Sequence, residues 1–177
     1  MPGGAHLTGP VLRRRPGTTR SRGVVLCVAL TAAVAGCGTD PVAITGPDLD
    51  EADSRACRAL VDDLPDALGD RERVEVTPAD ALGAAWGEPA IVLTCGVDEP
   101  GGITRTAVCQ EVNGIGWFVP DAALEDESLD ATLTAVGHRP RVQVSVPAEQ
   151  RPEGVAAALA GVAGAVEEHT ELVRPCL

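Results

Sequence analysis

Apolar and polar residues alternate in three short stretches in the middle of the chain, which is the pattern of strands with one buried face. The clearest stretch is residues 90–97, in which every odd-numbered position is apolar. Residues 73–77 and 141–146 place valines at every second position in the same way. We therefore predict a strand over each of these three stretches.

Two antiparallel hairpins are also predicted. The first joins residues 106–112 to residues 115–119 through Asn113-Gly114, because this pair readily takes the two positive φ angles of a two-residue turn. The second hairpin is predicted around a short turn, with strands at residues 132–136 and 141–146.

Two segments repeat apolar residues with helical spacing. In the first segment, positions i, i+3, i+4 and i+7 are Cys57, Leu60, Val61 and Leu64. A helix is predicted to begin near Asp53 or Ser54 and to end before Pro65. Residues 152–173 form the second predicted helix, whose apolar stripe consists of Val155, Leu159, Val162 and Val166.

These elements predict an α+β domain of two layers, in which an N-terminal and a C-terminal helix pack on a mostly antiparallel sheet. Residues 78–89, which include Trp86, are rich in Gly and Ala and are expected to form a connection. Residues 121–130 are rich in acids and are expected to form a solvated loop.

The first 36 residues contain five arginines and no acid, and residues 23–35 are uncharged. This uncharged run is too short to span a bilayer as a helix, so the combination predicts a secretory signal. It ends in Val34-Ala35-Gly36-Cys37, which resembles the bacterial lipobox. That resemblance implies a diacylglycerol on Cys37 and cleavage before it. The alternatives are a plain signal peptide and an uncleaved anchor.

The predicted organisation is a signal peptide at residues 1–36, a flexible tether at 37–50 and a single domain at 51–177. Residues 37–177 carry nine arginines and 26 acids, a formal net charge of −17. Such a domain repels phosphate backbones and anionic headgroups, so no nucleic-acid partner is expected. We expect contact with the outer face of the cell membrane to come from the lipid alone.

Four cysteines would remain in the exported domain, where oxidation to disulfides is favoured. These four can pair in three ways. They are Cys57, Cys95, Cys109 and Cys176. Cys57 is on the apolar stripe of the first predicted helix, and Cys95 is on the apolar side of a predicted strand. We therefore predict a Cys57–Cys95 disulfide, which leaves Cys109 to pair with Cys176. The spacing of the four does not suggest zinc, because it contains no C-x-x-C.

Several motifs stand together between Cys57 and Pro147, namely Cys57-Arg-Ala-Leu60, Leu64-Pro65, Ala84-Ala-Trp86-Gly-Glu-Pro89, Ile91-Val-Leu-Thr-Cys95-Gly-Val97, Val112-Asn-Gly-Ile-Gly-Trp117, Val136-Gly-His-Arg139 and Val142-Gln-Val-Ser-Val-Pro147. Together they resemble the actinobacterial lipoprotein family called domain of unknown function 3515. The most specific part is Trp-Gly-acid-Pro followed by Cys-Gly. The chain departs from the family pattern at Thr94, where an Arg is expected, and in the additional Cys109 and Cys176. The resemblance implies a cell-envelope lipoprotein, agrees with the Cys57–Cys95 pairing and supplies no activity.

Catalytic motifs are scarce in this sequence. The absence of Lys and Tyr excludes Schiff-base chemistry on lysine and acid–base chemistry on tyrosine. None of the serines Ser54, Ser128 and Ser145 lies in a Gly-x-Ser-x-Gly motif. We expect no metal and no cofactor. The favoured function is non-catalytic binding or scaffolding, with an envelope protein or cell-wall component as partner. The alternative is a small hydrolase that uses two carboxylates.

One group of residues is a candidate binding site. A cationic turn in an acidic domain would suit an anionic group, and an indole would supply a flat apolar wall. The candidate residues are Trp86, Trp117, His138, Arg139 and Arg141. The competing interpretation is that the tryptophans belong to the core and that the arginines pair with nearby acids.

Overall fold

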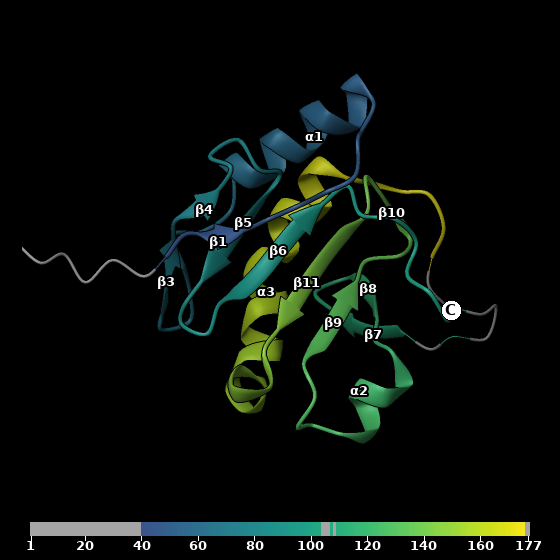
Figure 1. Ribbon diagram of the computed structural model, residues 1–177. Coiled ribbons are helices and arrows are strands. Elements are labelled where there is room, and N and C mark those ends of the chain that lie inside the picture. Colours follow the sequence, from purple (N-terminus) through teal and green to yellow (C-terminus); the bar gives the residue numbers. More distant parts are fainter. Residues whose placement is uncertain (1–39, 104–106, 108, 176–177) are drawn as a thin grey trace, which may run out of the picture. The chain divides into compact units, whose positions relative to one another are not determined.

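A computed structural model describes residues 40–103, 107 and 109–175. The described residues all belong to one compact unit of the chain, Gly38–Leu177. That unit is an α+β domain built on one large sheet, as predicted (Figure 1). No helix within the described ranges is long and apolar enough to cross a membrane.

The large sheet has eight strands in the order β2-β3-β5-β6-β11-β9-β8-β7, and every neighbouring pair is antiparallel. The strands are β2 (Ala67–Leu68), β3 (Arg71–Val74), β5 (Gly83–Trp86), β6 (Ile91–Cys95), β7 (Cys109–Val112), β8 (Ile115–Phe118), β9 (Ala131–Thr134) and β11 (Val142–Val146). At the centre of the sheet, Val144 of β11 lies between Leu93 of β6 and Leu133 of β9.

Two long helices pack against each other and against one face of this sheet (Figure 1). They are α1 (Glu51–Asp62) and α3 (Arg151–His169), and a 3-10 turn at Ala148–Gln150 leads into α3. Buried side chains from both helices join the apolar face of the sheet in one core, including Leu60, Leu93, Val144, Leu159, Val162 and Val166. The apolar stripes predicted for the two helices are therefore the faces that they bury.

Two short strand pairs lie outside the large sheet. β1 (Val42–Ala43) runs parallel to β4 (Val76–Thr77), and β10 (His138–Arg139) is antiparallel to β12 (Glu171–Leu172). The segment predicted as a tether therefore contributes a strand, and Ile44 beside it is buried. The second predicted helix ends at His169, earlier than expected, because the chain turns there to pair with β10.

The hairpin prediction at Asn113-Gly114 is confirmed, since both residues have positive φ and join β7 to β8. Two other expectations are wrong. Residues 83–86, expected in a connection, form the fully buried strand β5. Part of the expected acidic loop forms the helix α2 (Asp121–Glu125). The guanidinium of Arg151 stabilises α2 and the turn after it, because it donates to three backbone carbonyls there, those of Ala123, Asp126 and Leu129.

Candidate functional site

The candidate site is a pocket of about 250 Å³. Its lining residues come mainly from the start of α1, the turn after β6 and the β10–β11 connection, and Figure 1 labels these elements. Its charged and titratable lining residues are Asp48, Asp50, Asp53, Asp98, His138, Arg139 and Arg141. Leucine, valine, proline and glycine residues complete the wall. A pocket of this volume holds a ligand smaller than a typical drug molecule.

The N-terminal wall is built by the residues that begin α1. Asp50 is the N-cap residue, and its Oδ1 accepts a hydrogen bond of 2.8 Å from the backbone N–H of Asp53. Leu49 lies against Gly96 on the opposite wall. The φ angle of Gly96 is +83°, and a Cβ on this residue would lie only 2.3 Å from a methyl carbon of Leu49. The close approach therefore requires glycine at position 96.

The Cys57–Cys95 disulfide joins the two walls. Cys57 is one turn along α1 from Asp53, and Cys95 directly precedes Gly96. The Cα atoms of the two cysteines are 5.5 Å apart, and both side chains are buried. This predicted pairing is confirmed. Cys109 is also disulfide-bonded, but its predicted partner Cys176 lies outside the described residues, as does Cys37.

Both arginines of the pocket already have acidic partners. Arg139 Nε lies 3.6 Å from Asp53 Oδ2, and Arg141 Nη2 lies 3.4 Å from Glu99 Oε2. Arg141 also donates to the carbonyl of Val97, which fixes its side chain against the turn after β6. With four aspartates and two arginines in the lining, the pocket carries an excess of negative charge.

His138 is the buried polar residue of the site, with only 6% of its surface exposed. The hydroxyl of Thr170 donates its proton to the carbonyl of Val166, so it accepts from Nδ1 of His138 at 2.8 Å. In the neutral ring Nε2 is then an acceptor, and it has no hydrogen-bond partner among the described residues. Burial lowers the pKa of His138 from its ordinary value, and the carboxylate of Glu167 opposes this effect.

The lowered pKa predicts how stability changes with pH. Between the folded pKa and the ordinary value of 6.5, the unfolded chain binds more protons at this residue than the folded chain. The contribution of His138 to the free energy of unfolding is therefore fully present above pH 6.5 and is lost as the pH falls below this value. We expect His138→Gln to reduce the acid-side slope of unfolding free energy against pH, measured by urea denaturation. Identical slopes for the two proteins below pH 6.5 would contradict this.

The structure brings together only part of the predicted binding group. His138, Arg139 and Arg141 line the pocket, whereas the side chains of Trp86 and Trp117 are completely buried in the core. The competing interpretation is therefore the correct one for the tryptophans, which belong to the core and form no indole wall. It also holds for the turn, because both of its arginines face carboxylates.

Sequence reasoning missed the four pocket aspartates: Asp48, Asp50, Asp53 and Asp98. One local signal was available, because an Asp three residues before another Asp at the start of an apolar helical pattern is typical of an N-cap. No local sequence pattern indicates that the start of α1 faces residues 138–141. That arrangement depends on how the segment before α1 crosses the end of β6.

Comparison with known proteins identifies a family and no function. No curated protein and no solved structure matches the chain. The model of one family, described as "Protein of unknown function (DUF3515)", matches residues 22–174, which is most of the chain and includes the whole pocket lining. The match agrees with the resemblance of the motifs around Trp86 and Cys95. The chain belongs to the DUF3515 family.

Proposed function

We propose that this protein is a lipid-anchored binding domain of the cell envelope, and that its pocket takes a small polar ligand with a protonated amine. The observation that carries the proposal is the pocket itself, in which four aspartates surround two arginines that are already paired. The ammonium group of a ligand would offset the excess of negative charge in the pocket, whereas a free phosphate or sulfate would add to it.

The pocket lining supports binding rather than turnover. Asp50 is engaged as the cap of α1, and Asp53 faces Arg139. The side chain of Asp53 is 22% exposed, so its carboxylate is partly shielded from water and interacts more strongly with a bound cation than a fully exposed acid would. Asp48 and Asp98 are exposed lining residues and add to the negative potential.

A matched pair of sugars tests the ligand chemistry. D-glucosamine and N-acetyl-D-glucosamine share a ring, and only the first carries an ammonium group. For the full chain in detergent, we expect calorimetric titration to show weaker binding of the acetylated sugar by about tenfold or more, since a hydrogen bond to a charged group contributes about 1.5–3 kcal/mol. Asp53→Asn should weaken glucosamine binding by a similar factor.

The control is Asp80→Asn, which removes an exposed acid outside the pocket and should leave binding unchanged. Equal affinity for the two sugars, or equal effects of Asp53→Asn and Asp80→Asn, would contradict the proposed chemistry. Hydrolysis of a glycoside, abolished when one pocket aspartate becomes asparagine, would favour the carboxylate hydrolase instead.

The anchor is proposed on Cys37, because the lipobox-like motif places it directly after a short uncharged run. Two acyl chains suffice for stable membrane attachment. We expect Cys37→Ala to move the protein from the membrane pellet to the soluble fraction after cell lysis. Cys27→Ala is the matched control, since this cysteine lies within the uncharged run, and it should remain membrane-bound. Membrane attachment and cleavage unchanged in Cys37→Ala would show that the lipobox interpretation is wrong.

A further inference from the structure

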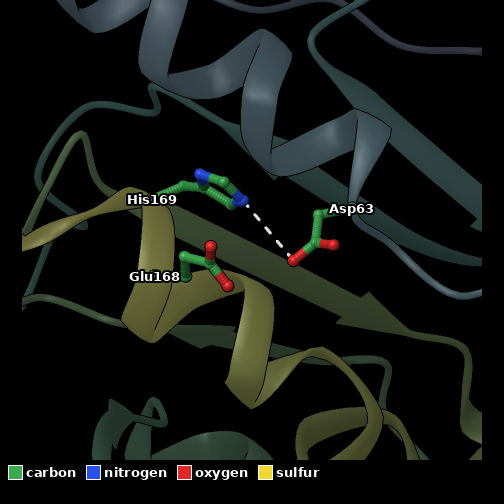
Figure 2. Close-up of side chains that lie close together, drawn as sticks. All are labelled: Asp63, Glu168 and His169. Carbon is green, nitrogen blue, oxygen red and sulfur yellow. Dashed lines mark ion pairs between the residues drawn. The ribbon is translucent and has the colours of Figure 1, made fainter.

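A second group of charged side chains lies where the ends of the two long helices meet. Asp63 is the C-cap residue of α1, and Glu168 and His169 are the last two residues of α3. Figure 2 shows their side chains directed toward one another between the helices. One ligand atom from each residue lies within 4.8 Å of the other two.

His169 and Asp63 lie within ion-pair distance, but their contact is too long for a good hydrogen bond. His169 Nε2 lies 3.4 Å from Asp63 Oδ2, and this buried nitrogen has no hydrogen-bond partner in the described part of the chain (Figure 2). Two ligands bound to one tetrahedral metal at 2.0–2.1 Å stand about 3.3 Å apart. The observed separation therefore suits two ligands of a shared metal ion better than it suits a direct hydrogen bond.

The charges at this place favour a cation. The C-terminal end of a helix carries partial negative charge and is stabilised by cations, yet acids occupy both ends here. Asp62 and Asp63 end α1, which has no basic residue in its last turn, and Glu167 and Glu168 precede His169 in α3. A divalent ion would compensate both helix ends and the carboxylates that stand there.

We propose that Asp63, Glu168 and His169 bind a divalent transition-metal ion, with zinc as the best match. An imidazole nitrogen with two carboxylates is a ligand set for zinc, whereas calcium and magnesium prefer a shell of oxygens alone. Three protein ligands leave a coordination position for water. The ion would connect the C-terminal ends of α1 and α3, and the site is separate from the pocket residues.

Cobalt(II) is the probe, because its visible absorption reports four-coordinate binding at a zinc site. For the full chain in detergent, we expect one equivalent of Co²⁺ to bind and to be displaced by Zn²⁺. Loss of an outer-shell partner already costs about 10–100-fold in metal affinity, so His169→Gln and Asp63→Asn should each weaken binding by about tenfold or more. Zn²⁺ should also raise the unfolding temperature of the wild type and not that of His169→Gln.

Asp62→Asn is the matched control for Asp63→Asn, since it makes the same chemical change one residue away. Glu167→Gln is a second control, which removes an acid next to Glu168 in α3. Both should retain Co²⁺ binding. If circular dichroism shows that a variant is poorly folded, a measurement on the wild type takes the place of that variant. We then expect the ring ¹⁵N chemical shift of His169 to change when Zn²⁺ is added. The proposal would be overturned if Co²⁺ showed no saturable binding, or if the controls and the ligand variants lost affinity equally. It would also be overturned if Co²⁺ binding persisted unchanged in His169→Gln, because the ion would then bind elsewhere, for example at a free thiol.

Discussion

Replacing Trp86 by alanine is expected to lower the free energy of unfolding by about 3–5 kcal/mol, the cost of removing a large aromatic side chain from a packed core. Trp86 is completely buried at the end of β5, in the same core as both long helices. Its indole N–H donates a hydrogen bond of 2.9 Å to the carbonyl of Pro65, just beyond the end of α1. Denaturation in guanidinium chloride, followed by circular dichroism, measures the loss.

The second tryptophan provides the control for the hydrogen bond. Trp117 is equally buried, but its indole nitrogen has no hydrogen-bond partner within the described residues. Trp86→Phe should therefore destabilise more than Trp117→Phe, by about 1–3 kcal/mol, because only the first leaves a carbonyl without its donor. Equal losses for the two phenylalanine variants would show that the Pro65 contact contributes nothing.

Trp86 acts together with Arg73 at the end of α1. The Arg73 guanidinium lies 6.0 Å from the centre of the Trp86 ring and donates to the carbonyls of Val61 and Leu64. The last carbonyls of a helix have no partner within it, so the contact with Val61 satisfies a group that would otherwise be unpaired. Trp86 is thus a structural residue, and changes in ligand binding in its variants would follow from loss of folding.

Local pattern was enough to predict the elements whose faces alternate cleanly. β6 and β11 show one apolar face in the sequence and pack that face on the helices. β5 escaped prediction because Gly83-Ala84-Ala85 has low strand propensity. Contacts from outside the segment require glycine at position 83, since a Cβ there would lie 2.3 Å from the backbone oxygen of Leu93 and close to Ile44.

Long-range contacts explain the other differences. α2 lies in an acid-rich stretch, and the arginine that satisfies its carbonyls comes from the start of α3. The sequence alone could place three residues of the pocket in one group, because His138, Arg139 and Arg141 are neighbours in the chain. It could not predict the acidic partner of Arg139, because Asp53 belongs to a helix distant in sequence.

The Cys57–Cys95 disulfide is expected to contribute about 4 kcal/mol to the free energy of unfolding, from chain-entropy arithmetic for cysteines 38 residues apart. The cross-link restricts the unfolded chain, and in the folded state it holds α1 on β6. The test is the double variant Cys57→Ala/Cys95→Ala, compared with the wild type in guanidinium chloride without reductant. This variant keeps Cys109, whose disulfide would also be broken if the wild type were simply reduced.

The same double variant should weaken glucosamine binding, because the disulfide positions Asp53 and Gly96 on opposite walls of the pocket. A comparison at a denaturant concentration where both proteins are fully folded separates this effect from stability. Cys109→Ala, which removes a cysteine outside the pocket lining, is the control and should leave the affinity unchanged. A double variant with wild-type affinity would mean that packing of Leu49 on Gly96 holds the walls without the cross-link. A stability loss below about 1 kcal/mol would mean that the cross-link restrains the unfolded chain far less than its loop length implies.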